Sequence, residues 1–189
     1  MKNKWCVSVA FLFFLVGICI NACTQECNSS NNDRWSEEKI QKWYDDQDWL
    51  IGCNYIPATA INQIEMWSAD TFNPKQIDKE LSWAHDLGFN TLRVFLSSVV
   101  WKNDAKGMKK RMDEFLNICK KYSIRPMFVF FDDCWNAESA YGKQPELKPG
   151  VHNSGWVQDP SCSLRKDTLT LYPFLQEYVK DIIRTYAHD

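Results

Sequence analysis

The sequence Ile124-Arg-Pro-Met-Phe-Val-Phe-Phe-Asp-Asp133 decides the fold. An almost unbroken apolar run of strand length ends there in two adjacent carboxylates, as is typical of a strand buried on both faces of a parallel sheet. In barrel and doubly wound folds, the residues just past the carboxyl end of a strand line the ligand site. We therefore expect Asp132, Asp133, Trp135 and Asn136 to lie at a functional site.

The composition suits a protein with a sizeable core. The chain has 189 residues, of which 45% are hydrophobic and 14% aromatic, and a formal net charge of -2. This charge gives no electrostatic reason to expect a nucleic-acid partner. The nine tryptophans are unusual. Indole rings suit the apolar faces of sugars as well as they suit a core, and we expect most of the nine to be packing residues.

The N-terminus has the pattern of a targeting segment. Lys2 and Lys4 precede an uncharged stretch that reaches Ile20, which is too short to span a bilayer as a permanent helix. The following Ile20-Asn-Ala-Cys23 resembles a bacterial lipobox, in which the cysteine becomes the lipidated first residue. We expect residues 1–22 to be a lipoprotein signal peptide, and Cys23 to anchor an exported protein to a membrane. Ordinary cleavage and secretion is the alternative.

Residues 23–34 are polar and lack a hydrophobic period, so we expect a flexible tether. Without the signal peptide and Cys23, five cysteines remain and none forms a C-x-x-C pair: Cys27, Cys53, Cys119, Cys134 and Cys162. A metal site is therefore not expected, and buried free thiols are the favoured interpretation, although one disulfide stays open.

The folded part is expected to begin near Trp35. Ser36 can cap a short amphipathic helix with Ile40, Trp43 and Tyr44, and a strand over 49–56 ends at Pro57. A loop is expected to continue to Phe72. A helix over 73–88 then has Asn73 as its cap, Pro74 in its first turn and Gln76 placed to reach back to the cap.

The stretch Thr91–Leu96 predicts a second buried strand, in which Arg93 lies among apolar neighbours. A buried guanidinium needs an acidic partner, and the alternative is an arginine that reaches water from a strand edge. A second amphipathic helix follows, with its apolar positions recurring on one face: Met108, Met112, Phe115, Leu116 and Cys119.

Strands that begin near 50, 91 and 125, each pair separated by a helix, predict parallel strands joined by right-handed crossovers. Three such units without a Gly-rich phosphate loop favour an eight-stranded barrel. The long connection from 133 to 167 carries His152 and Trp156 and is expected to fold over the site. A further amphipathic helix is expected over 171–186.

Four stretches carry a family resemblance: W-L-I-G-C-N-Y-I-P-A-T-A-I-N-Q-I-E-M-W, D-L-G-F-N-T-L-R-V-F-L, F-D-D-C-W-N and V-H-N-S-G-W-V-Q. They resemble the N-terminal third to half of bacterial exported barrel glycoside hydrolases, similar to family-5-type cellulases, mannanases and xylanases. The resemblance implies an α/β fold with a (β/α)8 TIM barrel, retaining hydrolysis of β-linked polysaccharides or oligosaccharides by two glutamates, and no cofactor. It also implies that Arg93 supports the nucleophile. The residues that it places in the sugar-binding cleft are Trp67, Asp132, Trp135, His152 and Trp156.

The resemblance places both catalytic glutamates beyond Asp189, so residues 35–189 are expected to form the N-terminal part of a truncated barrel without hydrolytic activity of its own. Asp132 and Asp133 are poor candidates for the catalytic pair, because adjacent strand residues point to opposite faces. Asp132 is expected to bind a sugar hydroxyl or a cation, and Asp133 to cap a loop. His152 is either a hydrogen-bonding site residue or a structural one. A non-catalytic, membrane-tethered carbohydrate-binding lipoprotein is the alternative function, and a barrel enzyme with another substrate is a third.

Overall fold

The computed structural model describes residues 34–187, which divide between Asp48 and Trp49 into two compact units. The expected signal peptide (1–22), Cys23 and all but the last residue of the expected tether lie outside the described residues. The first unit contains α2 (Glu37–Asp45), which Ser36 caps by accepting a hydrogen bond from the Lys39 N–H at 3.2 Å. The predicted helix is confirmed, but none of its residues is buried.

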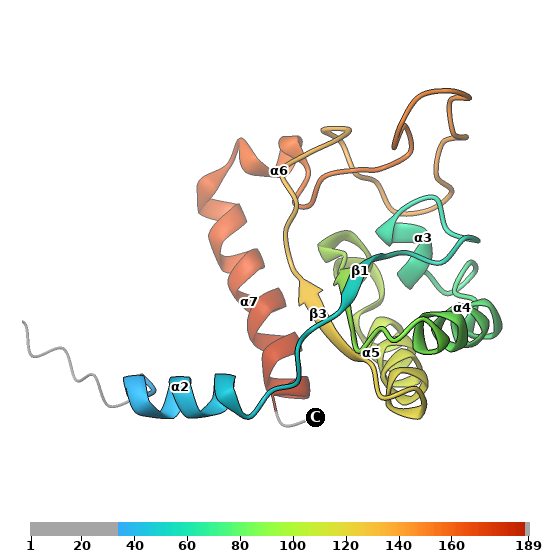
Figure 1. The fold of residues 1–189 in the computed structure, drawn as a ribbon. Helices are drawn as coiled ribbons and strands as arrows, with labels where there is room; N and C mark the ends of the chain where they lie inside the picture. Colours follow the sequence, from blue (N-terminus) through green and yellow to red (C-terminus); the bar gives the residue numbers. More distant parts are fainter. Residues whose placement is uncertain (1–33, 188–189) are drawn as a thin grey trace, which may run out of the picture. The chain divides into compact units, whose positions relative to one another are not determined.

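The second unit is a mixed α/β structure built on a small parallel sheet (Figure 1). Its strands are β1 (Gly52–Tyr55), β2 (Thr91–Phe95) and β3 (Arg125–Val129), hydrogen-bonded in the order β1-β2-β3. All three predicted strands are confirmed, and each is shorter than expected. Gly52 pairs with Thr91, where a Cβ on the glycine would collide with the threonine carbonyl.

Two crossover helices, α4 (Pro74–Asp86) and α5 (Ser98–Lys121), pack against one face of this sheet. Leu92 and Val94 of β2 are buried there together with the apolar positions of the helices: Ile77, Leu81, Met108, Met112, Phe115 and Cys119. Asn73 caps α4 as predicted, but the Gln76 side chain donates to Glu80 at 2.7 Å instead of reaching back. Helix α5 has a kink at Asp104, whose backbone is not helical.

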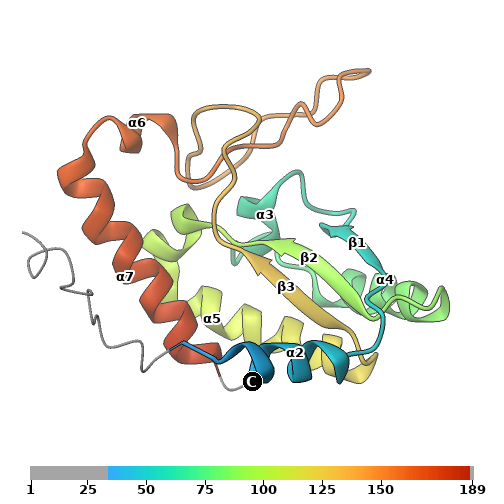
Figure 2. The same cartoon turned by 60° about the vertical axis from the view of Figure 1, so that its left-hand side comes forward.

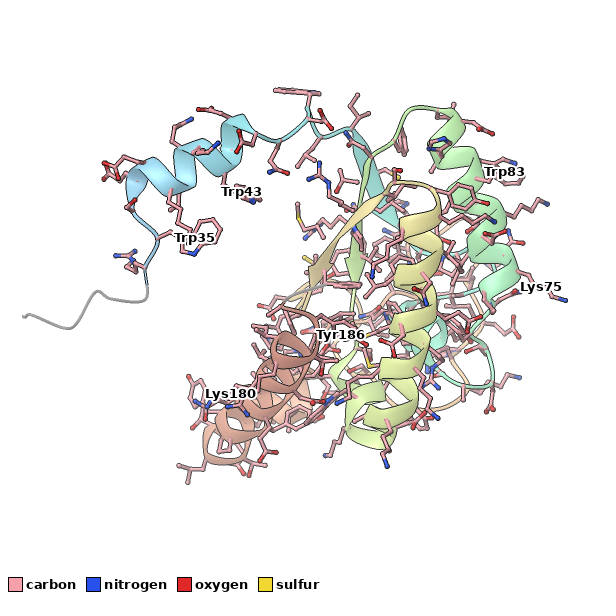
Figure 3. All side chains as sticks on the ribbon, turned by 90° about the horizontal axis from the view of Figure 1, so that it is seen from below. Trp35, Trp43, Lys75, Trp83, Lys180 and Tyr186 are labelled. Atoms are coloured by element: carbon pink, nitrogen blue, oxygen red, sulfur yellow. The ribbon has the colours of Figure 1, made fainter. Side chains whose placement is uncertain are left out.

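Helix α7 (Thr168–Tyr186) packs beside α5 and confirms the predicted third amphipathic helix. Asp181 joins the two helices, because it accepts hydrogen bonds from Trp101 Nε1 at 2.7 Å and from Lys109 Nζ at 2.6 Å. The Tyr186 hydroxyl donates to the Lys109 carbonyl at 2.9 Å, and its side chain is labelled at the end of α7 in Figure 3. Among the helices of residues 34–187, none is both long enough and apolar enough to cross a bilayer.

The opposite face of the sheet carries Asn54, Arg93 and Met127, which occupy one register position across the three strands. No helix between Trp49 and Ala187 covers this face, and Met127 is 54% exposed. The expectation that the 124–131 strand is buried on both faces is therefore wrong. β3 buries only the face on which Phe128 meets Phe115, and it ends at Val129.

The chain after β3 forms a long connection above the carboxyl ends of the strands (Figures 1 and 2). Two isolated bridges hold it, Asp132 to Asp159 and Asn136 to Val157, and it leads into α6 (Cys162–Arg165). A short helix, α3 (Gln63–Trp67), replaces part of the loop that the sequence predicted between Pro57 and Phe72. Asn62 caps α3 by accepting from the N–H groups of Ile64 and Glu65.

Candidate functional site

A pocket of about 50 Å³ lies where the three strands end. Side chains from the ends of β1 and β2, from α3 and from the long connection surround it: Asn54, Tyr55, Ile56, Gln63, Met66, Phe95, Asp132 and Trp156. Two of the expected cleft residues, Asp132 and Trp156, thus line one pocket although they are far apart in the sequence. This position agrees with the general location of ligand sites at the carboxyl ends of parallel strands.

The backbone around Trp156 is fixed by the start of α3. The buried Asn62 donates from Nδ2 to the Gly155 carbonyl at 2.9 Å, and Gln63 donates from Nε2 to the Val157 carbonyl at 2.8 Å. Asn136 donates from Nδ2 to the Trp156 carbonyl at 2.7 Å. Both neighbours of Trp156 and its own carbonyl are therefore anchored, so the indole is presented by a well-defined backbone.

Close packing adds to this anchoring. A Cβ on Gly155 would collide with the side chains of Ile61 and Leu147, so a larger residue there would force both side chains to move.

Three rings form an aromatic cluster on the long connection: Trp135, His152 and Trp156. The Trp135 and Trp156 ring centroids are 5.3 Å apart at an interplanar angle of 76°, and the Trp135 and His152 centroids are 6.0 Å apart. Trp135 is 42% exposed and has a φ of 74°, which is a strained backbone region for a bulky residue. The cluster gives the pocket an exposed aromatic margin.

The two adjacent aspartates have different partners in the structure. Asp132 caps the loop, because its Oδ1 accepts from the Cys134 N–H at 3.0 Å. Asp133 forms an ion pair with Arg165 of α6. The prediction that Asp133 caps a loop is therefore wrong, and Asp132, which lines the pocket, keeps its second oxygen for another donor.

Asp159 is a structural carboxylate that the sequence did not single out. Its backbone N–H and carbonyl pair with those of Asp132 at 2.8 Å each, and its side chain is only 2% exposed. Its Oδ2 accepts from the Ser98 N–H at 2.6 Å, and its Oδ1 from the Ser98 hydroxyl. Burial raises the pKa of Asp159 to about 6, and the nearby charge of Asp132 acts in the same direction, while the Ser98 hydrogen bonds oppose the rise.

Two expected site residues lie elsewhere. Trp67 is fully buried, where Nε1 donates to the Phe95 carbonyl at 2.8 Å and the ring meets Phe115 edge-on. The expectation that Trp67 faces a sugar cleft is wrong, because no part of the ring reaches solvent.

Arg93 is exposed, not buried beside a carboxylate. It donates to Asn54 Oδ1 at 3.3 Å and lies over the Phe95 ring at 4.6 Å. The expectation of an acidic partner is wrong in this structure, because the open face of the sheet leaves the guanidinium in water.

Residues 34–187 contain no cluster of three or more His, Cys, Asp or Glu side chains that could hold a metal ion.

Four of the five thiols considered above are described, and all four are free. Cys119 is buried, as expected, and burial raises its pKa to about 12, whereas Cys53 and Cys134 are exposed, contrary to expectation. Cys27 lies outside the described residues.

The α3 cap could have been found in the sequence, because Asn62 and Glu65 have the spacing of a capping box. The Glu65 carboxylate does accept from the backbone N–H of Ile61 at 2.8 Å, one residue before the cap. Asp159 offers no comparable local signal.

Comparison of the chain with known proteins finds no matching family model, no matching curated protein and no matching solved structure.

Proposed function

We propose that the chain binds β-linked saccharides at the pocket between the strand ends and α3. The observation that carries the proposal is that the Trp156 indole and the Asp132 carboxylate line one pocket, with Trp135 extending the aromatic surface outward. Indole faces pack against the apolar faces of sugar rings, and carboxylate oxygens accept hydrogen bonds from sugar hydroxyls. The pocket itself is smaller than the roughly 300–1,000 Å³ of ordinary small-molecule sites, so it would take one substituent of a ring that lies on the aromatic cluster.

The sequence resemblance supports a more specific form of this proposal, in which residues 35–189 are the N-terminal part of a (β/α)8 glycoside hydrolase barrel. Three parallel strands in sequential order, joined by α4 and α5, are the repeating unit of such a barrel. The open face with Asn54, Arg93 and Met127 would then become the barrel interior.

Retaining hydrolysis needs two carboxyl groups about 5–5.5 Å apart, and Asp132 is the only carboxylate among the residues that line the pocket. The proposed activity of residues 35–189 alone is therefore binding, and hydrolysis is proposed for a barrel whose further strands supply two glutamates. The alternative, a non-catalytic carbohydrate-binding lipoprotein, shares the same binding site. Release of reducing ends from β-linked glucans, mannans or xylans by this chain would contradict the assignment of binding alone.

The experiment for the binding site compares two tryptophans. Trp156→Ala should weaken the binding of cello-, manno- or xylo-oligosaccharides about 2- to 13-fold, since an aromatic contact contributes roughly 0.5–1.5 kcal/mol. Trp83→Ala is the matched control, because Trp83 is 53% exposed and extends outward from α4 (Figure 3). Calorimetric titration measures both. Unchanged affinity in Trp156→Ala, with an unchanged melting temperature, would refute the site.

Export and lipid anchoring are proposed from residues 1–23 of the sequence, which lie outside the described residues. Cys23→Ser should release the protein from the membrane fraction and abolish labelling by fatty acid. A variant that stays with the membrane and is labelled like the parent would contradict the lipoprotein assignment.

A further inference from the structure

A second pocket, of about 440 Å³, has in its lining Ser98, whose N–H donates to Asp159. It is formed by the start of α5, the chain around Ser139, α6, and Phe174 of α7. Figure 2 shows α6 next to the beginning of α7. Asp159 contacts a lining residue of each pocket, because its backbone pairs with Asp132 of the first and its carboxylate accepts from Ser98 of the second. The volume is within the range of about 300–1,000 Å³ that is typical of small-molecule sites.

Hydroxyl groups dominate the polar lining of this second pocket, with contributions from Ser98, Ser139, Tyr141, Ser161 and Ser163. The Ser139 hydroxyl is inaccessible to solvent and has no hydrogen-bond partner in the protein. A buried hydroxyl in a native protein is normally paired, so an unpaired one at a pocket indicates a missing partner. The Ser161 and Ser163 hydroxyls hydrogen-bond to each other at 3.1 Å, which leaves one of their two O–H groups to donate to a ligand.

Aromatic and aliphatic surface completes the second pocket. Phe174 packs against Trp101 at a centroid distance of 5.8 Å, and Tyr141, which belongs to the long connection, is 44% exposed. Hydroxyl groups placed beside aromatic faces match a ligand that has hydroxyls around its rim and C–H groups on its faces.

The charges around the second pocket favour a neutral ligand over an anionic one. Lys102 is the one cationic side chain of the lining, and its ammonium group lies 5.7 Å from the Phe174 ring centroid. Two carboxylates lie directly behind the lining: Asp159 accepts from Ser98, and Glu138 accepts from the Ser163 N–H at 3.3 Å. A phosphate or carboxylate would meet more negative than positive charge there.

We propose that the second pocket is a binding site for a neutral saccharide unit, independent of the pocket that Trp156 lines. The Ser139 hydroxyl and the Ser161–Ser163 pair supply its hydrogen bonds, and Phe174 and Tyr141 supply its apolar walls. The inference depends on the chemistry of this pocket and not on the function proposed above, so either can fail without the other.

The test follows backbone amide chemical shifts of the full chain during titration with cellotriose, mannotriose and xylotriose, and separately with inorganic phosphate. At least one trisaccharide should shift the amides of Ser139, Ser161 and Ser163 in the parent and equally in Trp156→Ala. Ser139→Ala should weaken this binding about 2- to 10-fold, the loss of one hydrogen bond, while Ser82→Ala on α4 is the matched control. Ser163→Phe, which fills the pocket, should abolish these shifts and leave those at Gln63 and Trp156 unchanged.

Two results would overturn the proposal: no trisaccharide shifts these amides, or phosphate shifts them and the trisaccharides do not. Shifts at Ser139, Ser161 and Ser163 without any at Gln63 and Trp156 would support the second pocket and refute the first. The reverse pattern would refute the second pocket and leave the first intact.

Discussion

Asp159 shows how one buried carboxylate makes the stability of the site depend on pH. Its pKa in the folded chain is raised to about 6, mainly by burial, from an ordinary value near 3.9. The folded state therefore holds this proton more tightly than the unfolded state does. Stability from this group is fully present below about pH 4 and is lost as the pH rises through about 6, with a total on the order of 3 kcal/mol.

We predict that Asp159→Asn removes this contribution to the pH dependence and stabilises the chain at pH 7. The asparagine side chain keeps an acceptor for the Ser98 N–H and can donate to the Ser98 hydroxyl, so the geometry survives without the buried charge. Urea unfolding between pH 4 and 8 measures the difference between parent and variant. Asp133→Asn, at a mostly exposed carboxylate, is the control. Identical pH profiles for parent and Asp159→Asn would contradict the prediction.

Trp67 and Trp83 lie on neighbouring elements, and we predict opposite responses to the same substitution. Trp67→Phe should lower the free energy of unfolding by about 1–3 kcal/mol, because the buried Phe95 carbonyl loses its donor and a void remains beside Phe115. Trp83→Phe, at a half-exposed position, should stay within about 0.5 kcal/mol. Chemical denaturation measures both, and equal losses would mean that the burial of Trp67 is misassigned.

At the level of elements, the sequence correctly predicted the features that depend on residues close together in the chain, such as helix caps and helix periods. The Asn73-Pro74 start of α4 and the Met108–Cys119 period of α5 are confirmed, since capping and periodicity act over a few residues. Helix α3 was missed because five residues are too few to show a period, and only its capping-box spacing indicated it. The apolar run before Asp132 cannot reveal that only one face of β3 is covered, because a run carries no information about its neighbours.

The arrangement of the candidate site depends on contacts that are distant in the sequence. The aromatic cluster forms because Asp132 pairs with Asp159 and because Asn62 holds the chain at Gly155, and no local spacing encodes either contact. The position after a strand and the family resemblance therefore predicted Trp135, His152 and Trp156 as candidates one by one. Their juxtaposition and the buried position of Trp67 required the structure.

Asn62 has two structural roles that substitution can separate. We predict that Asn62→Ala lowers stability by about 1–2 kcal/mol through loss of the α3 cap, and also increases the exchange of the amides near Trp156, because Gly155 loses its donor. Asn73→Ala is the matched control, since Asn73 caps α4 by accepting from the Gln76 N–H. It should lower stability to a similar extent without loosening the long connection.

Hydrogen exchange followed residue by residue distinguishes these outcomes. If Asn62→Ala and Asn73→Ala give the same exchange pattern over 144–157, α3 does not position Trp156.

The sheet of the second unit is covered by helices on one face and open on the other. Val94 on the covered face is fully buried, whereas Met127 on the open face is 54% exposed beside Arg93. Between Trp49 and Ala187, β1 and β3 each have one edge without a partner strand. Unpaired strand edges favour association between chains, so we expect the 189-residue chain to self-associate.

Met127→Glu tests whether further chain covers the open face. In the 189-residue chain, the new carboxylate would stay in water directly across from Arg93, so stability should change by less than about 1 kcal/mol and self-association should fall. In a longer chain whose added strands enclose this face, the same carboxylate would be buried, and Arg93 would offset only part of the several kcal/mol that desolvation costs.

Val94→Glu, on the covered face, should unfold either chain. Sedimentation velocity and chemical denaturation of the parent and both variants measure these effects. A large loss of stability in Met127→Glu of the 189-residue chain would show that its open face is already covered, because a carboxylate that remains hydrated has no desolvation penalty.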